Sequence, residues 1–501
     1  MKARWRVSGL LAGGLALSFL WAASRVDGSI PFPPLNVAER IIRLTPGGVA
    51  TFFIDILGHN ALRLLTAGTV LAFLVLSTVL PEASRARGAV RPTLAGAALG
   101  AAAAGAALAD PTPPHPVAAL LTSAGAGILY AVCLAWLTEA APEERHEQLD
   151  RSRRRALALV GTAAAAIALG GTALGRLARR LAGPDTDVPI RAPDEAAATP
   201  SRPLFPRIHG LSPEVTSAAD HYVVDIDLLD PVVEADGWTL TVGGLVERPL
   251  TITFSQLQRD FTLVEEYSVL TCISNEVGGG LVGSSSWIGV RLGEVLGRAR
   301  LREGAVDVVL RCADGYAASL PVETALDPGA ILAIAQNRRP LTQEHGFPCR
   351  LRVPALYGVK NAKWVEEIEV VASEFRDYWT RRGWSETAVV RTQSRIDAVG
   401  SEIRAGEAAW IAGLAWAGAR GIARVEVSVD AGATWAPARM NLPLSPLAWT
   451  QWAYRWVPQA PGTHLVLSRA FDGLGAVQDP ATRPPHPSGA SGYHQVDVRV
   501  S

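Results

Sequence analysis

Two stretches in the second half of the chain contain residues that could bind a metal-containing group. In the first, residues 270–279 (LTCISNEVGG), Cys272 follows a strand-like run and precedes a polar, glycine-rich loop. A thiol at such a position can become a thiolate ligand for a soft or high-valent metal. A buried structural cysteine is the competing interpretation, and for a single cysteine it is the more common case. The glycines at 278–280 fit either the close approach of a bulky ligand or a plain turn.

The second stretch is basic. Residues 344–354 (EHGFPCRLRVP) lead into residues 357–364 (YGVKNAKW), which places Arg350, Arg352, Lys360 and Lys363 close together in sequence. Fixed cations on a segment stiffened by proline and glycine suit an anionic group such as phosphate. A solvated basic face is the alternative interpretation, and neither stretch decides the function by itself.

The sequence patterns around these two stretches predict an α+β domain, whose strands and helices would position them. Residues 238–242, 250–254 and 305–311 have strand-like patterns, and residues 292–298 have the pattern of a short helix. Strands and helices do not alternate in a regular βαβ order, so a doubly wound parallel sheet is not expected.

From about Thr387 onward the helical patterns end. Strand-like runs cover residues 408–417, 423–430, 449–456 and 464–471, with turns between them. Seven of the fourteen tryptophans lie between Trp384 and Trp456. Short strands at near-regular spacing around a large aromatic core predict a β-sandwich with a structural role.

The first 180 residues are of a different kind. Runs without charged residues occur at 9–24, 64–81, 92–109, 116–138 and 156–175. A helix needs about 20 apolar residues to cross a bilayer, with about 17–25 tolerated, so we predict an α-helical transmembrane bundle of about five helices. The first run is short and follows three basic residues, so a cleaved signal peptide is the alternative to a retained helix.

The loops between these runs predict an orientation. Lysine and arginine collect in alternate loops, which places the amino terminus in the cytoplasm and everything after about Leu181 outside. The basic residues that carry this bias are Lys2, Arg4, Arg6, Arg85, Arg87, Arg91, Arg145, Arg151, Arg153, Arg154 and Arg155. No pair of histidines lies inside the runs, since His59 and His115 lie near their ends, and haem ligation usually needs axial ligands within the helices. We therefore interpret the membrane half as an anchor.

Residues 152–157 (SRRRAL), just before the last run, resemble a twin-arginine export signal, which lets an already folded domain cross the membrane. An ordinary positive-inside anchor is the alternative. After this run, residues 183–206 contain six prolines and predict a tether rather than a folded element.

Composition excludes two further classes of protein. The 501 residues contain 47 Lys+Arg and 47 Asp+Glu, and this balance argues against a general nucleic-acid binder. Four scattered cysteines argue against a secreted scaffold that is held together by disulfides.

Taken together, the motifs resemble the sulfite oxidase family of molybdopterin enzymes. The cysteine block is followed by residues 314–321 (DGYAASLP), 345–350 (HGFPCR) and 360–364 (KNAKW) in the order and spacing of that family. Residues 425–432 (VEVSVDAG) and 489–494 (GASGYH) are similar to its C-terminal immunoglobulin-like module. The resemblance runs from about His221 to Ser501 and implies a molybdopterin-binding catalytic domain (211–375) and an immunoglobulin-like β-sandwich of the dimerisation type (385–501). The apolar runs and the prolines predict the two parts that precede them, a transmembrane anchor (1–180) and a Pro-rich linker (181–210).

The resemblance also implies roles for single residues. Cys272 would be the thiolate on molybdenum, beside the dithiolene sulfurs of one pterin, and Tyr316 would hydrogen-bond substrate or an oxo ligand. His345 and Arg350 would hold the pterin and its phosphate, whereas Cys349 is expected only to pack in the core. The other implied cofactor contacts are Tyr222, Val223, Cys312, Asn361, Ala362 and Lys363.

The implied activity is two-electron oxygen-atom transfer with a small oxo donor or acceptor, outside the cytoplasmic membrane. Sulfite oxidases carry an arginine and an asparagine–histidine pair in the first cofactor strand, where this chain has residues 222–225 (YVVD), a departure that disfavours doubly charged sulfite. No haem is expected in this chain, so electrons would pass to a separate partner or to quinone. The family analogy suggests a homodimer. The alternatives are a sulfoxide or N-oxide reductase with the same cofactor and a non-catalytic surface binding module.

Overall fold

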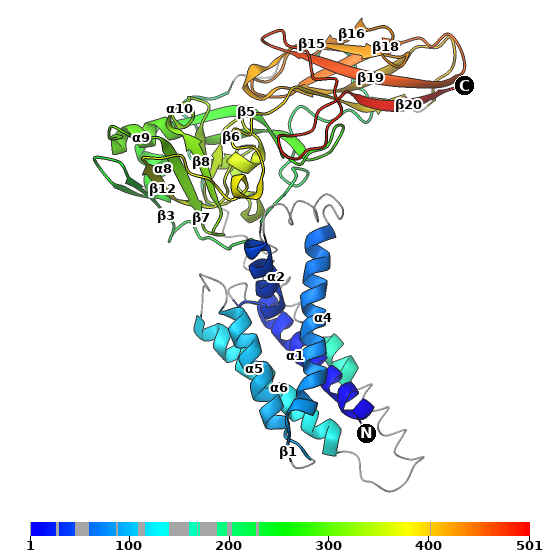
Figure 1. The fold of residues 1–501 in the computed structure, drawn as a ribbon. Helices are drawn as coiled ribbons and strands as arrows, with labels where there is room; N and C mark the ends of the chain where they lie inside the picture. Colours follow the sequence, from blue (N-terminus) through cyan, green and yellow to red (C-terminus); the bar gives the residue numbers. More distant parts are fainter. Residues whose placement is uncertain are drawn as a thin grey trace. The chain divides into compact units, whose positions relative to one another are not determined.

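The chain forms two compact units, Met1–Pro184 and Asp185–Ser501 (Figure 1). The structure is a computed structural model. The structure describes residues 2–26, 30–45, 60–86, 89–108, 116–139, 160–167, 169–170, 188–197, 203–226, 230–400 and 402–501.

The first unit is helical. Its helices are α1 (Lys2–Val26), α2 (Pro33–Leu44), α4 (Asn60–Ala83), α5 (Pro92–Ala107) and α6 (Pro116–Glu139), and β1 (Arg85–Ala86) and β2 (Ala89–Val90) form a short hairpin. Three segments are long and apolar enough to cross a membrane, namely Trp5–Val26, Leu64–Ala83 and Pro116–Thr138. The predicted span at 92–109 forms the shorter apolar helix α5, of 16 residues. Of the run at 156–175, the structure describes residues 160–167 and 169–170, which are helical.

Small residues let two of these helices approach closely. A Cβ atom added at Gly96 of α5 would lie 2.4 Å from the carbonyl oxygen of Gly127 in α6, and one added at Gly127 would lie 2.5 Å from that of Gly96. Any larger residue at either position would push the helices apart. Close packing through glycine and alanine is typical of helices in membranes, where burial of apolar surface does not drive association.

The second unit begins with an α+β domain, as predicted. One sheet has the order β10-β9-β6-β5, with β11 also paired to β9, and the other has the order β4-β3-β12-β7-β8. Pairing is antiparallel except between β3 and β12. The strands are β3 (Thr239–Gly244), β4 (Leu250–Thr253), β5 (Leu263–Thr271), β6 (Val282–Arg291), β7 (Asp307–Cys312), β8 (Ala317–Pro321), β9 (Ile331–Gln336), β10 (Arg339–Pro340), β11 (Arg350–Arg352) and β12 (Val365–Val371).

Three short helices, α8 (Phe254–Asp260), α9 (Leu292–Ala299) and α10 (Val322–Ala325), accompany these sheets. In α9 the buried residues Leu292, Val295, Leu296 and Ala299 follow the i, i+3, i+4, i+7 spacing that places them on one face. Both sheets contribute to a single core, which includes Leu240, Trp287, Leu310 and Ile334. The predicted helix at 292–298 and the strands at 238–242, 250–254 and 305–311 are confirmed.

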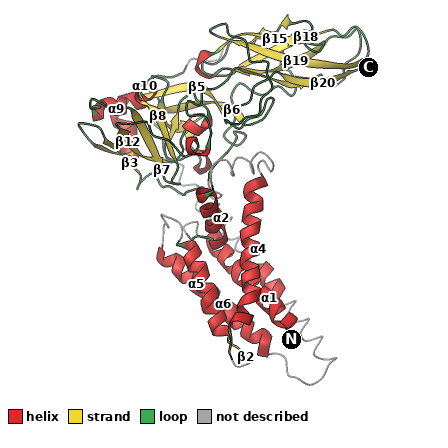
Figure 2. Ribbon diagram, in the orientation of Figure 1, coloured by secondary structure: helices red, strands yellow, loops and turns green. Residues whose placement is uncertain are grey.

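The second domain of this unit is built almost wholly from strands (Figure 2). One four-stranded sheet has the order β13-β14-β18-β17, and the other has the order β16-β15-β19-β20. Ile411, Val425, Trp452 and Val466 belong to the core that the two sheets share. The strands are β13 (Gln393–Val399), β14 (Ala409–Trp416), β15 (Ile422–Ser428), β16 (Ala436–Pro437), β17 (Arg439–Met440), β18 (Thr450–Trp456), β19 (Gly462–Asp472) and β20 (His494–Val500). The four predicted strands are confirmed, and the immunoglobulin-like assignment stays a prediction.

The Pro-rich segment at 183–206 is not a free tether in its described parts. The backbone N–H groups of Asp194 and Glu195 donate to the carbonyl oxygen of Leu263 on β5, at 2.8 and 3.2 Å. Glu195 also pairs with Arg291 at 2.5 Å, and Phe205 is buried in the C-terminal domain. Because β5 is an edge strand, its unpaired backbone groups accept an extended segment even where proline prevents regular structure. These residues therefore pack against the second unit without forming a regular element, and the linker assignment of 181–210 stays a prediction.

Candidate cofactor site

Cys272 directly follows β5, at the start of the loop that leads to β6. Its side chain is only 6 % exposed, its backbone N–H donates to Leu281 (2.9 Å), and its Sγ lies 3.0 Å from the Ser274 hydroxyl oxygen. Burial raises the pKa of the Cys272 thiol, and the Ser274 hydrogen bond acts against that shift. Without a metal the thiol keeps its proton, which a bound metal would displace.

The basic stretch meets Cys272 at Gly358. A Cβ atom added to Gly358 would lie 2.9 Å from the Tyr222 hydroxyl oxygen and 3.7 Å from the Cα atom of Cys272. Three segments that are distant in sequence therefore converge here. A side chain at position 358 would fill the space between the Tyr222 hydroxyl and the cysteine loop.

Arg350, on β11, is buried. Its Nη1 atom donates to the carbonyl oxygen of His345 at 3.0 Å and its Nη2 atom to that of Asn361 at 3.3 Å, whereas its Nε atom has no partner among the described residues. Burial lowers the pKa of Arg350 to about 10. The Nε2 atom of His345 lies 2.8 Å from the carbonyl oxygen of Ala218, and burial lowers the pKa of this imidazole to about 4, so it is neutral at pH 7.

Arg352 was predicted as one of the cations of the basic stretch, but the family resemblance implied no cofactor contact for it. It is fully buried, its Nη2 atom donates to the hydroxyl of Ser268 and the carbonyl of Val269 at 3.1 Å each, and its Nη1 atom contacts Asn361. Burial lowers its pKa to about 9. The Arg-x-Arg pattern of residues 350–352 could have indicated this role. Residues i and i+2 of a strand point to the same face, so Arg352 lies on the same face as Arg350. The solvated-face interpretation of this stretch is wrong.

Asn361 and Ala362 hold the basic stretch in shape. The Asn361 side-chain oxygen accepts from Arg352 and from the Val353 backbone N–H (2.7 Å), and its amide nitrogen donates to two backbone carbonyls. The carbonyl oxygen of Ala362 accepts from the backbone N–H of Leu351 at 2.7 Å. The Asn361 side chain is thus occupied within the protein, and a contact from Asn361 to a cofactor would come from its backbone.

Lys363 is the remaining cation of the site. Its Nζ atom forms an ion pair with Asp225, donates to the carbonyl oxygen of Glu344 at 2.8 Å and lies 4.4 Å from the centre of the Trp364 ring. Burial lowers the pKa of Lys363, and the Asp225 carboxylate opposes that shift. Asp225 belongs to the segment in which the chain departs from sulfite oxidases.

We call His345, Arg350, Arg352 and Lys363 the basic cluster. Its two guanidinium groups each bury an Nε atom without a partner among the described residues. Buried charges and buried unpaired donors cost free energy unless an anion or acceptor meets them. The arrangement therefore fits a phosphate-bearing organic group that binds here, next to a thiol that can hold a metal.

Three predicted residues contribute less directly. The Tyr316 hydroxyl donates to the carbonyl oxygen of Val359, and its ring lies 5.7 Å from that of Tyr378. Cys312 is buried in the main core, which raises the pKa of its thiol well above the ordinary range. The Val223 side chain is 42 % exposed. Cys349 is completely buried, as expected for a residue that only packs.

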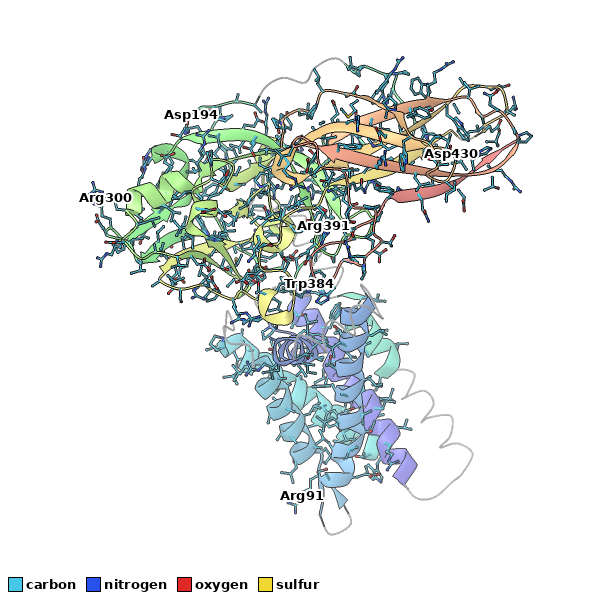
Figure 3. The ribbon with its side chains drawn as sticks, turned by 45° about the horizontal axis from the view of Figure 1, so that its top comes forward. Arg91, Asp194, Arg300, Trp384, Arg391 and Asp430 are labelled. Atoms are coloured by element: carbon cyan, nitrogen blue, oxygen red, sulfur yellow. The ribbon has the colours of Figure 1, made fainter. Side chains whose placement is uncertain are left out.

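The glycine-rich loop after Cys272 packs against the C-terminal domain. A Cβ atom at Gly278, whose φ is +78°, would lie 2.3 Å from the His494 ring. Behind the site, the backbone N–H of Arg391 donates to the Tyr357 hydroxyl at 3.2 Å, and Gly489 leaves room for that hydroxyl. Arg391 and Trp384 lie on the segment that leads from the first domain to the second (Figure 3). The C-terminal domain thus supports the cysteine loop.

A buried ion pair connects the basic stretch to the segment after β12. Lys360 and Asp377 are 2.5 Å apart, and their side chains are only 4 % and 2 % exposed. We expect Asp377→Asn to lower the free energy of unfolding by about 3–5 kcal/mol, because it leaves a buried ammonium without its counter-ion. Denaturant unfolding of the full chain in detergent would measure this loss. Arg404→Met, which breaks an exposed pair with Glu407, is the control and should change little; an equal effect of both would contradict the prediction.

Comparison with known proteins places this site in a family. The oxidoreductase molybdopterin binding domain matches residues 228–379, and the Mo-co oxidoreductase dimerisation domain matches residues 385–498. Rat mitochondrial sulfite oxidase is 30 % identical over 245 residues, which are 41 % of this chain and 44 % of the rat protein. The uncharacterized oxidoreductase YuiH of Bacillus subtilis is 33 % identical over 147 residues, 29 % of this chain and 72 % of that protein.

A solved structure agrees at the level of the fold. The sulfane dehydrogenase SoxCD from Paracoccus pantotrophus superposes with a TM-score of 0.52 and 24 % identity, over 58 % of this chain and 82 % of that one. Fold and site define a molybdopterin-binding oxidoreductase domain followed by a dimerisation domain. The chain belongs to the sulfite oxidase family of molybdenum-dependent oxidoreductases. It spans less than half the length of the rat sulfite oxidase.

Proposed function

We propose that this chain is a membrane-anchored oxidoreductase that uses a molybdenum–molybdopterin cofactor for two-electron oxygen-atom transfer on a small substrate outside the cytoplasmic membrane. The observation that carries the proposal is that the Tyr222 hydroxyl and the Cys272 loop meet at Gly358, which lies in the same stretch of chain as the basic cluster. The match of both domain families supports it.

In this proposal different residues of the chain bind the metal, bind the organic part of the cofactor and position the site. The bound cofactor would supply a metal that passes an oxo group to or from the substrate. Cys272 would hold the metal as a thiolate. His345, Arg350 and Lys363 would hold the organic part, and buried guanidinium groups suit its phosphate. Tyr222 would lie between the metal and the organic part of the cofactor. Tyr316, whose hydroxyl donates to the carbonyl oxygen of Val359, would orient the segment that carries Tyr357 and Gly358.

One observation favours the reductase alternative. The side chains of Val223 and Val224 are 42 % and 46 % exposed, in the segment where sulfite oxidases carry an arginine. An apolar surface there gives a doubly charged anion no counter-charge, whereas an uncharged sulfoxide or N-oxide does not need one. We therefore propose sulfoxide or N-oxide reduction with the same cofactor as the second candidate function.

Two measurements on the purified full chain test the proposal. Protein from a host that makes molybdopterin should contain molybdenum and pterin in near-equal amounts, and near-absence of both would favour a non-catalytic binding module. Redox assays with sulfite and with methionine sulfoxide then separate the two reactions. Turnover of sulfite alone supports the oxidase, and turnover of the sulfoxide alone supports the reductase.

We also propose a multi-pass membrane location and two kinds of partner. The three apolar segments of the first unit are long enough to span a bilayer, which supports the anchor. The dimerisation domain supports a homodimer. Electrons would leave or arrive through a separate protein or through quinone, since no haem is expected in this chain.

The export route gives a prediction from the sequence alone, because Arg153 and Arg154 lie outside the described residues. Molybdopterin is inserted in the cytoplasm, so the loaded domain would have to cross the membrane folded. We expect the double change Arg153→Lys and Arg154→Lys to keep the outer unit in the cytoplasm, although both positions remain basic. Protease accessibility of the outer unit in intact cells would measure this. Normal export would show that these residues act only as a positive-inside anchor.

A further inference from the structure

His221 is a buried imidazole beside the basic cluster to which no motif assigns a role. Its side chain is 4 % exposed, and its Nε2 atom is buried without a hydrogen-bond partner among the described residues. The ring stacks on Tyr222 with centres 5.3 Å apart, and it meets Trp287 and His345 edge-on at 5.9 and 5.6 Å. Packing therefore holds the ring firmly and leaves one nitrogen unused.

Gly283 on strand β6 leaves room for the imidazole ring of His221. A Cβ atom added to Gly283 on β6 would lie 2.6 Å from Cδ2 and 2.7 Å from Nε2 of His221. No side chain could occupy position 283 while the imidazole stays where it is. The fold thus accommodates a buried polar ring at a cost, because a buried polar atom without a partner is unfavourable.

The surroundings determine which nitrogen carries the proton. Burial, together with the nearby His345, Arg350 and Arg352, lowers the pKa of His221 to about 3, so the ring is neutral at pH 7. Its Nδ1 atom lies 3.4 Å from the carbonyl oxygen of Tyr222, which assigns the proton to Nδ1. Nε2 is then a hydrogen-bond acceptor. The unpaired Nε atoms of Arg350 and Arg352, by contrast, are donors.

We propose that the Nε2 atom of His221 accepts a hydrogen bond from an N–H group of the pterin ring and so helps to hold the cofactor. Phosphate and dithiolene groups carry no N–H donor, whereas a pterin ring carries several along its edge. The two arginines would meet the anionic part of the cofactor, and His221 would recognise its heterocycle. This inference rests on the proposed function only in requiring that the chain binds the pterin.

Two amides of different length test the proposal. The side-chain amide of glutamine reaches the position of Nε2, whereas that of asparagine reaches only the position of Nδ1. The full chain carrying His221→Asn should release its pterin about three- to tenfold faster than the wild type, the effect expected for one lost hydrogen bond. His221→Gln should release it at a rate close to that of the wild type. Fluorescence of the released, oxidised pterin would measure both rates.

A structural role for His221 gives different results. If the contact of Nδ1 with Tyr222 were what mattered, asparagine would retain the pterin and glutamine would lose it. Melting of the cofactor-free chain is the fold control, and both variants should match the wild type. Equal release from wild type and His221→Asn, or a lower melting temperature that accounts for the loss, would overturn the inference alone. Absence of pterin from the wild-type chain would overturn the proposed function and the inference with it.

Discussion

Replacing Cys272 with alanine should remove turnover while the outer unit stays folded. Alanine cannot supply a thiolate, so the metal would lose its only ligand from the protein in the proposed site. Groups that merely contact a metal ligand change activity by about 10–100-fold, so we expect loss of the ligand itself to exceed about 100-fold. Steady-state turnover, on whichever of sulfite or methionine sulfoxide the wild type uses, would measure the loss.

A matched control is available within the same domain. Cys349 is also completely buried, but it has no role in the proposed site. Cys349→Ala should keep turnover per bound pterin, although it leaves a small cavity. Pterin content should fall little in Cys272→Ala, because the basic cluster remains intact. Turnover of Cys272→Ala at the wild-type rate would contradict the ligand assignment.

Replacing Arg350 with methionine should remove most of the bound pterin. Methionine fills much of the same space but carries no charge, and charge-assisted hydrogen bonds contribute about 1.5–3 kcal/mol each. Loss of two such bonds to a phosphate predicts a decrease in pterin affinity of at least about 100-fold. The ratio of pterin to protein after gel filtration would measure it.

Arg350 also donates to the backbone at His345 and Asn361, so its structural role must be separated from its binding role. Arg350→Lys keeps the charge but not the planar set of donors, and should retain an intermediate amount of pterin. Melting of the cofactor-free chain shows whether the backbone contacts matter for folding. Full pterin content in Arg350→Met would contradict the assignment of the basic cluster.

Local patterns predicted much of the fold. The spacing of apolar residues was enough for α9 and for strands such as β4 and β19, because each of these elements shows the periodicity of its own buried face. The same holds for the apolar segments of the first unit. The motif around Cys272 and the stretch from His345 to Lys363 were also evident, because the chemistry resides in the residue types themselves.

The tertiary structure decided which of these polar residues are buried and what they contact. His345 meets Ala218, 127 positions away, and Arg352 meets Ser268, 84 positions away, so no local window could distinguish a buried cluster from a solvated face. The glycine loop faces His494 for the same reason, and residues 194–195 add to the edge of β5 although their composition resembles a linker. The sequence determined the chemistry available along the chain, whereas long-range packing decided where that chemistry is concentrated and left His221 with an unpaired nitrogen.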